Sequence, residues 1–328
     1  MDETTAWPIT LDDVRAARTR IAAHLSPTPL RSYPPLDAAV GHGIRVLVKH
    51  ENFNPTNSFK VRNALSAMTA LSAGERARGV VAATRGNHGA GLAYAGALLG
   101  IPVTICVPIG NSPGKNAAMR GYGATLVEEG RDYDEAAAVA QRLVETRGLA
   151  LVHSTNDARV IAGAATLALE MLEERPDLDA LVVGVGGGSQ AVGAITVARA
   201  LAPAVEVFGV QAAGASAIHD SFHAGRPVLR DAAVTFADGL ATRGVYAMTF
   251  PALRAGLTGF VTATDAELAS ALRLLIDTTH GLVEGAGAAG LAGLLRLADR
   301  LSGKTVGIVL SGGNIDRDVL LQVLLGTI

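Results

Sequence analysis

The sequence is poor in cysteine, in aromatic residues and in long apolar runs. Cys106 is its one cysteine, which excludes an intramolecular disulfide framework and a zinc site built on cysteines. The net charge of −2 indicates no basic face, so no nucleic-acid partner is expected. No apolar run reaches membrane-spanning length, and the N-terminus lacks the basic and apolar segments of a secretory signal. We therefore expect a cytoplasmic protein without a membrane partner.

What is abundant is apolar sequence and glycine, in a pattern that predicts an α/β fold. Hydrophobic residues make up 49% of 328 residues, and there are 38 glycines. From residue 40 onward, short apolar runs without polar alternation lie between alanine-rich helical patterns, as in parallel sheets covered on both faces. The expected strands are 46–48, 80–83, 103–107, 124–127, 181–183, 205–210 and 306–310, and the clearest helical patterns are 90–99, 134–145, 160–173 and 266–279.

We expect two mostly parallel, doubly wound sheets in two domains. A small domain at 75–155 would fit the usual domain size, and 1–74 together with 156–328 would form the large domain. Near the N-terminus, Thr10 and Asp13 predict the start of a further helix.

The segment 57–65 carries the first candidate for chemistry, Lys60. It follows turn-forming residues and Phe59, and an Ala/Leu-rich helical pattern begins beside it. A lysine held near a helix start can lose its proton and attack a carbonyl, for example that of an aldehyde cofactor. The alternative is a solvated helix lysine, and the neighbours of Lys60 do not decide between the two.

The segment 183–190 predicts an anion site. An apolar strand runs into Gly186, Gly187 and Gly188, and a helical pattern follows from Ser189. Such a turn exposes backbone N–H groups at the positive end of a helix, and glycine lets a phosphate approach closely. A plain tight turn is the alternative. The spacing fails the dinucleotide-binding pattern, and no Gly-Lys-Ser/Thr follows as in a nucleotide-binding P-loop.

Two more turns follow apolar strands. Residues 84–89 offer backbone amides, Arg85 and Asn87 to a carboxylate, although Asn87 could instead cap a helix and His88 could lie on the surface. Ser311 follows the last strand, where ligands bind in open α/β sheets. We expect all four turns to converge on one crevice.

Together these motifs resemble fold-type II pyridoxal-phosphate enzymes, in the branch of threonine/serine dehydratases and serine racemase. The resemblance runs from Pro29 to Asn314 and includes His153, the segment 160–163, and 237–239. It implies a tryptophan-synthase-β-like fold, pyridoxal 5′-phosphate as cofactor and a homodimer. It implies Lys60 and Ser311 as catalytic residues. The cofactor-binding residues would be Phe59, Lys60, Asn87, Gly186, Gly187, Gly188, Ser189, Glu284 and Ser311, and the substrate-binding residues Ser58, Thr84, Arg85, Gly86, Asn87, His88 and Gly239.

The implied reaction is the β-elimination of water from threonine or serine, which yields a 2-oxo acid and ammonia. Arg85 stands where a racemase carries a serine that acts as acid and base, and a guanidinium stays protonated, so racemisation is disfavoured. Gln211 and Ala217 replace the acidic metal ligands of the family, so no metal site is expected.

Four alternatives are weighed at this point. Arg85 or Arg243 could pair with a second carboxylate, which would make the substrate 3-hydroxyaspartate or a hydroxyectoine-pathway intermediate. Arg85 could instead tie its loop to a nearby carboxylate. β-Replacement chemistry is disfavoured by Val61 and by the glycine loop, and a scaffold without catalysis is disfavoured by Lys60, Asn87 and Ser311 together.

Overall fold

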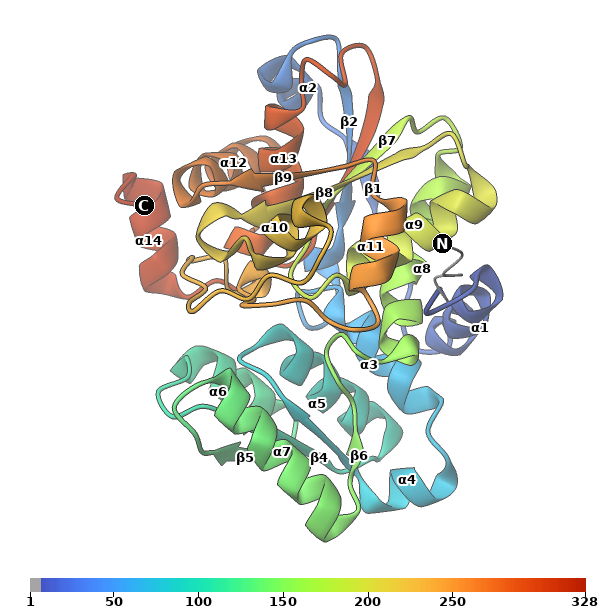
Figure 1. Ribbon diagram of the computed structural model, residues 1–328, viewed down its shortest axis with the longest axis vertical. Coiled ribbons are helices and arrows are strands. Elements are labelled where there is room, and N and C mark those ends of the chain that lie inside the picture. The colour runs from blue at the N-terminus through green and yellow to red at the C-terminus, as the bar shows by residue number, and fades with distance from the viewer. Residues whose placement is uncertain (1–6) are drawn as a thin grey trace.

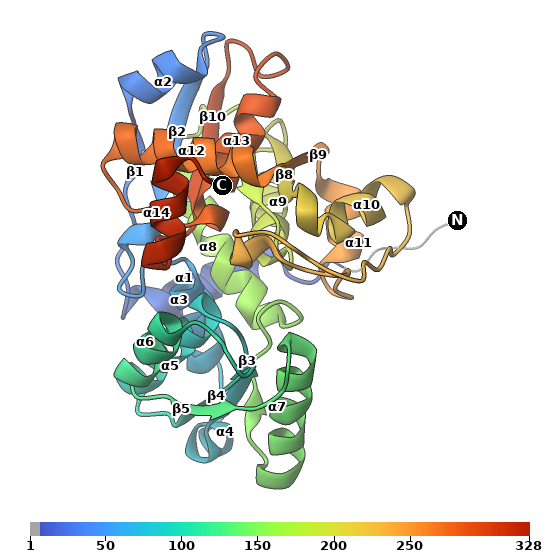
Figure 2. The same ribbon diagram turned by 90° about the vertical axis from the view of Figure 1, so that its left-hand side faces the viewer.

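Two separate β-sheets form the framework of the computed structural model, which describes residues 7–328 (Figures 1 and 2). The larger sheet has the strand order β1-β2-β10-β7-β8-β9 and the smaller one β5-β4-β3-β6. All pairings are parallel except that of β1 with β2. The strands are β1 (Leu30–Ser32), β2 (Arg45–His50), β3 (Val80–Ala83), β4 (Val103–Val107), β5 (Thr125–Glu128), β6 (Ala150–Leu151), β7 (Ala180–Gly184), β8 (Glu206–Ala212), β9 (Gly259–Ala263) and β10 (Thr305–Leu310).

Helices connect these strands and cover both sheets. The α-helices are α1 (Leu11–Ala22), α2 (Pro34–Val40), α3 (Lys60–Thr69), α4 (Ala73–Arg78), α5 (Asn87–Leu99), α6 (Pro113–Gly121), α7 (Tyr133–Arg147), α8 (Ala158–Glu174), α9 (Ser189–Leu201), α10 (Ala217–Ala224), α11 (Phe250–Gly256), α12 (Asp265–Thr279), α13 (Ala289–Arg296) and α14 (Arg317–Leu325). Short 3₁₀ turns lie at η1 (Glu51–Phe53), η2 (Ala213–Ala215), η3 (Asp238–Leu240) and η4 (Gly285–Ala288).

The larger sheet is buried on both faces, as β2 illustrates. Val46 and Val48 pack into one core with α2, α12 and α13, whereas Leu47 between them packs into the opposite core with α8 and α9. Each core is apolar, so no polar residue is needed at alternate positions of the strand. This is why the central strands read as uninterrupted apolar runs in the sequence.

The smaller sheet repeats this arrangement. Val80 and Ala82 of β3 pack with α3 and α5, and Val81 and Ala83 pack on the other face against α7. Cys106 of β4 is fully buried on the α7 side, in agreement with the strand predicted there. Figure 1 shows this lobe below the larger one, with the connecting chain near α3 and α8.

The predicted strands and helical patterns are all present, with ends that differ by a few residues. The predicted start of the first helix is confirmed, because Thr10 and Asp13 form a capping box at α1. The prediction missed β1, β6 and β9. Two of these are only two or three residues long, with β6 inside the short apolar run 149–152, and β9 begins with a glycine and carries a threonine.

The domain boundaries at residues 75 and 156 stay a proposal. Helix α3 lies before the first boundary, yet it packs on α5 of the smaller lobe as well as on α8 of the larger one. Among residues 7–328, no helix is both long and apolar enough to cross a membrane.

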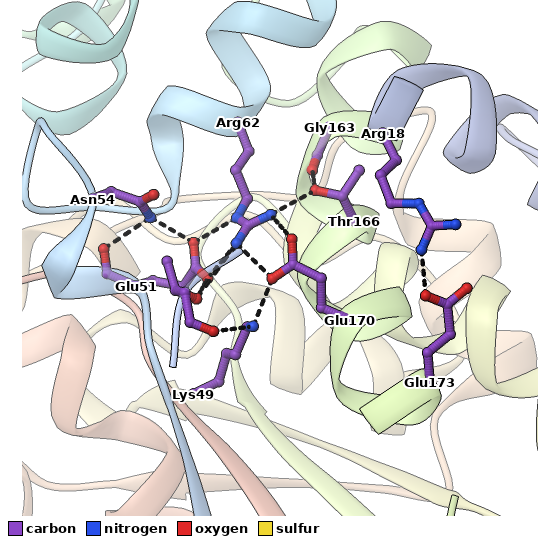
Figure 3. Close-up of polar contacts among 10 residues, drawn as sticks. Arg18, Lys49, Glu51, Asn54, Arg62, Gly163, Thr166, Glu170 and Glu173 are labelled. Atoms are coloured by element: carbon purple, nitrogen blue, oxygen red, sulfur yellow. Dashed lines mark hydrogen bonds and ion pairs between the residues drawn. The ribbon is translucent and has the colours of Figure 1, made fainter. Parts of the chain in front are cut away.

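A buried ion-pair network, shown in Figure 3, joins α3 to the larger lobe. The guanidinium of Arg62 donates from Nε to Glu51 over 2.7 Å and from Nη1 to Glu170 over 2.6 Å. Lys49 donates from Nζ to Glu170 over 2.6 Å. The side chains of Arg62 and Glu51 are 1% and 0% exposed, so two cations and two anions balance one another away from water.

The charges in this network depend on one another. Burial acts to raise the pKa of Glu51, but the charge and hydrogen bonds of Arg62 hold it below the usual value. Thr28 and Asn54 complete the coordination of the same carboxylate, with hydrogen bonds of 2.6 and 2.7 Å. Removing one member would therefore strand a buried charge.

We predict that Arg62→Met lowers the free energy of unfolding by about 3–5 kcal/mol, because Glu51 and Glu170 lose their shared cation. Urea titration at neutral pH measures this loss. Arg18→Met is the matched control, since Arg18 pairs with Glu173 at the surface, where the side chains are 39% and 45% exposed. The control should cost less than about 1 kcal/mol. Equal losses in the two variants would contradict a dominant role for the buried network.

The same comparison has a predicted pH dependence. The folded-state pKa of Glu51 lies below its unfolded value, so its stabilisation is present above the unfolded pKa and is lost as the pH falls through the folded one. The difference in the free energy of unfolding between the wild type and Arg62→Met should therefore become progressively smaller below about pH 4. A gap that stays constant on acidification would rule out this contribution of Glu51.

Candidate active site

The turns that were expected to converge line one cavity of about 910 Å³ between the two lobes. It lies at the carboxyl ends of β3, β7 and β10, with the start of α3 beside them. Parallel strands of both sheets thus direct their following turns into the same space. Of the predicted site residues, the cavity wall contains Phe59, Lys60, Thr84, Arg85, Gly86, Asn87, His88, Gly186, Gly187, Gly188, Ser189, Gly239, Glu284 and Ser311.

Ser58 is the predicted site residue that does not reach the cavity wall. It is fully buried, and its hydroxyl accepts a 3.4 Å hydrogen bond from the backbone N–H of Lys60. Its backbone also forms an isolated bridge with Gly312. This places Ser58 as a support of the turn that carries Lys60, and we do not include it among the substrate contacts proposed below.

Lys60 is the first residue of α3, and its amine lies in the cavity. The Nζ atom is 4.9 Å from the ring centroid of Phe59. Within residues 7–328, Nζ has no hydrogen-bonding partner. Burial lowers the pKa of Lys60 to about 8, although Glu284 acts in the opposite direction. An amine with this pKa is available as a neutral nucleophile or base near neutral pH, and its partly buried place in the cavity wall differs from that of a solvated helix lysine.

The glycine turn after β7 forms a cradle of backbone N–H groups at the start of α9. Gly188 has a φ of +99°, which disfavours any side chain. A Cβ on Gly186 would lie 2.1 Å from the carbonyl oxygen of Gly239, and one on Gly187 would lie 2.0 Å from Thr155 Oγ1. The turn therefore tolerates only glycine at these positions and leaves its amides free for an anion.

Asn87 is held in a chain of side-chain hydrogen bonds. Its Nδ2 donates to Glu284 over 2.7 Å, and its Oδ1 accepts from Asn314 Nδ2 over 2.8 Å. These contacts orient the amide, with its second N–H still free. Burial raises the pKa of Glu284 to about 7, against the opposing effect of the Asn87 hydrogen bond.

Both structural alternatives for this loop are wrong. Gly86, not Asn87, is the residue before α5, and the side chain of Asn87 makes no capping bond. His88 is 2% exposed rather than on the surface, and its Nε2 lies 2.9 Å from the carbonyl oxygen of Val152. The sequence could not reveal these contacts, because Glu284 and Val152 are far away along the chain.

The two arginines that were candidates for a second carboxylate differ in their surroundings. Arg243 pairs with Asp134 at the cavity wall. Arg85 is exposed on the cavity wall, and no carboxylate of the described residues lies within ion-pair distance of it. No carboxylate within residues 7–328 thus ties down the Arg85 loop, and the guanidinium of Arg85 is accessible to a ligand in the cavity.

Ser311 faces the cavity after β10, and its backbone oxygen accepts a 3.1 Å hydrogen bond from the N–H of Phe59. Gln211 stands where the family has an acidic metal ligand, and both ends of its side-chain amide are hydrogen-bonded within the protein. Its Oε1 accepts from the backbone of Ile218 and His219, and its Nε2 donates to Thr242. In the part of the chain that the structure describes, no cluster of three metal-ligating side chains occurs. The absence of a metal site stays a prediction.

Sequence reasoning missed several residues of the cavity wall. Lys115 of α6 pairs with Asp238 of η3 across the two lobes, and both line the cavity. His153 and Tyr246 also line it, with ring centroids 5.7 Å apart. His153 comes two residues after β6, at the end of the short apolar run 149–152, which is a signal that could have marked it as a residue at a strand end. The resemblance included His153 and Asp238 without a role as site residues, and for Lys115 the sequence held no signal.

These groups fit pyridoxal 5′-phosphate in their chemistry. A partly neutral amine suits a covalent bond to an aldehyde. The glycine cradle, which any Cβ would fill, suits the phosphate. The free N–H of Asn87 and the hydroxyl of Ser311 are available to polar atoms of the ring.

Comparisons with known proteins point the same way. Residues 21–312 match the family described as "Pyridoxal-phosphate dependent enzyme". An L-threonine ammonia-lyase of Geobacter sulfurreducens is 43% identical over 84% of this chain and 68% of its own length. An L-threo-3-hydroxyaspartate ammonia-lyase of Pseudomonas is 37% identical over 96% of this chain and 98% of its own.

Solved structures agree over the whole fold. Maize serine racemase superimposes with a TM-score of 0.92 at 29% identity, over 98% of both chains. Serine racemase of Dictyostelium discoideum superimposes with a TM-score of 0.88 at 32% identity, over 94% of this chain and 99% of that one. These matches confirm the predicted fold and cofactor dependence. The chain therefore belongs to the pyridoxal-phosphate-dependent enzymes, in the fold-type II group that holds these ammonia-lyases and racemases.

Proposed function

We propose that this pyridoxal-phosphate-dependent ammonia-lyase removes water and then ammonia from a β-hydroxy amino acid such as threonine or serine, leaving a 2-oxo acid. The observation that carries the proposal is the amine of Lys60, which has no hydrogen-bonding partner among residues 7–328 and a pKa lowered to about 8, in the cavity that the glycine cradle also lines. The sequence relatives named above are ammonia-lyases of hydroxy amino acids, which supports the same reaction class.

In this proposal each part of the cavity wall has one task toward the cofactor. Lys60 holds its aldehyde carbon, the amides of Gly186 to Ser189 hold its phosphate, and Phe59 packs beside its ring. Asn87 and Ser311 hydrogen-bond polar atoms of the ring, and Glu284 and Asn314 keep Asn87 oriented. When bound, the cofactor withdraws electrons from the α-carbon of the attached amino acid.

Lys60 is proposed as the base. Once the substrate amine has replaced it, its Nζ accepts the α-proton, which its lowered pKa permits near neutral pH. The turn at 84–87 is proposed to hold the substrate carboxylate at the N-terminal end of α5, where backbone N–H groups favour negative charge. Thr84, Gly86 and His88 shape this turn, and Gly239 lines the cavity beside Gly186 of the cradle.

Elimination is favoured over racemisation by the position of Arg85. A racemase needs a second base on the opposite side of the α-carbon, and a guanidinium cannot serve as one. Serine racemases, which are among the structural neighbours of this chain, share its fold.

A second candidate is an acidic hydroxy amino acid such as 3-hydroxyaspartate. The specific observation in its favour is the guanidinium of Arg85, which lines the cavity without a carboxylate partner among the described residues. A bidentate pair with a second substrate carboxylate would satisfy it.

We predict that Lys60→Ala abolishes release of 2-oxo acid from every hydroxy amino acid, because both the covalent attachment and the base are lost. The wild type with cofactor should show an absorbance band of the covalently bound cofactor, and the variant only that of free or loosely bound aldehyde. Val61→Ala, at a neighbouring position that does not line the cavity, serves as control and should keep the band. An unaltered band in Lys60→Ala would refute the assignment.

We predict that Arg85→Ala separates the two substrate candidates. If Arg85 binds a second carboxylate, kcat/KM for 3-hydroxyaspartate falls about 10- to 100-fold while that for threonine changes little. Arg243→Ala is the matched control, because Arg243 already pairs with Asp134. A substrate preference that Arg85→Ala leaves unchanged would exclude the acidic substrate and leave threonine or serine.

A further inference from the structure

The turn between β6 and α8 places one histidine in the cavity with a defined proton position. His153 Nδ1 accepts hydrogen bonds from the backbone N–H groups of Thr155 and Asn156, both over 2.9 Å. Two donors on Nδ1 require a lone pair there, so the ring proton is on Nε2. Nε2 has no partner among residues 7–328 and is not sealed off, and the ring lines the cavity.

This imidazole is held in its neutral form by its surroundings. A proton on Nδ1 would face the two N–H groups and break both hydrogen bonds. Burial lowers the pKa of His153, Asp157 acts in the opposite sense, and Lys60 lowers it further. The other titratable neighbours are His88, whose pKa burial lowers to about 3, and Tyr246, whose pKa burial raises to about 12, so both are neutral as well.

His153 lies between the two proposed anion sites. It follows β6, which pairs with β3, and β3 leads into the 84–87 turn proposed for the substrate carboxylate. On its other side, Thr155 lies against Gly187 of the glycine cradle. The β-carbon of the substrate and the oxygen on it are held by neither site, so the Nε2–H of His153 is available to that oxygen.

We propose that His153 is the hydrogen-bond donor for the β-oxygen of the substrate, and that it binds the leaving hydroxyl through a neutral Nε2–H. This inference rests on the proposed function. As the carbon–oxygen bond breaks, its electron pair goes to the oxygen, where a preorganised donor stabilises the developing charge. The water that leaves consists of this hydroxyl and the proton taken from the α-carbon, and His153 keeps its own proton.

The test compares two leaving groups in His153→Asn. The asparagine carbonyl can still accept from the Thr155 and Asn156 N–H groups, but no donor remains at the Nε2 position. Serine and 3-chloroalanine give the same 2-oxo acid, and chloride leaves without needing a hydrogen-bond donor. We expect kcat for serine to fall roughly 10²-fold and kcat for 3-chloroalanine to fall less than about 3-fold. Equal losses for both substrates would overturn the proposal.

His153→Gln is the second variant, because its amide nitrogen reaches the Nε2 position. It should recover at least about 10-fold of the serine rate lost in His153→Asn. The affinity for pyridoxal phosphate, measured by absorbance titration, should be the same in both variants and in the wild type. If that affinity falls together with the rates for both substrates, the donor serves the cofactor phosphate and the proposal is wrong.

The tautomer of the His153 imidazole can be measured directly, without any turnover. Histidine ¹⁵N spectra should show His153 protonated on Nε2 alone across about pH 6 to 8. A proton on Nδ1, or titration in this range, would overturn the proposal. The proposed function and the role of His153 are tested by different outcomes. A wild type that converts no hydroxy amino acid refutes the proposed function, whereas an active wild type with an unaffected His153→Asn refutes only the role of His153.

Discussion

The position of the reactive lysine depends on the buried guanidinium two residues after it. Lys60 and Arg62 lie in the first turn of α3, and Arg62 is bound by Glu51 after β2 and by Glu170 of α8. The first turn of a helix otherwise lacks partners for its own N–H groups and frays easily. Here two carboxylates hold it against the larger lobe, while the helix as a whole packs on both α8 of that lobe and α5 of the smaller one. The amine of Lys60 therefore enters the cavity from a turn that cannot shift with either lobe alone.

Burial shifts the two ionisable groups nearest to the proposed chemistry in opposite directions. It lowers the pKa of Lys60 to about 8 and raises that of Glu284 to about 7. One low-dielectric cavity thus brings an amine and a carboxyl group into the same range near neutrality. Neither group needs a dedicated charged partner to reach it. The hydrogen bond from Asn87 then limits how far Glu284 is shifted and links the carboxyl group to the proposed cofactor contact.

The sequence sufficed for the parts of the site that lie at strand ends. The turns at 84–89, 186–189 and 311–314 each follow an apolar strand, and parallel topology alone brings such turns together. It did not suffice where two distant segments meet. The sequence left open whether Asn87 caps a helix, and the contact with Glu284 settles its orientation, whereas His153 follows a strand of only two residues that the prediction missed. The inward position of Ser58, which depends on the bridge to Gly312, had no signal at all.

The cavity wall has one part, the glycine cradle, where substitutions are not tolerated, and another part, around Arg85, where they are. Gly186 touches the backbone of Gly239, and Gly187 touches Thr155, so a side chain at either position collides with a segment far away in sequence. Random substitution there fails unless a second, simultaneous change accompanies it. Arg85, in contrast, is an exposed residue of the cavity wall. Divergence among related chains can therefore alter the accepted side chain through single steps at the Arg85 wall, while cofactor binding is inherited unaltered.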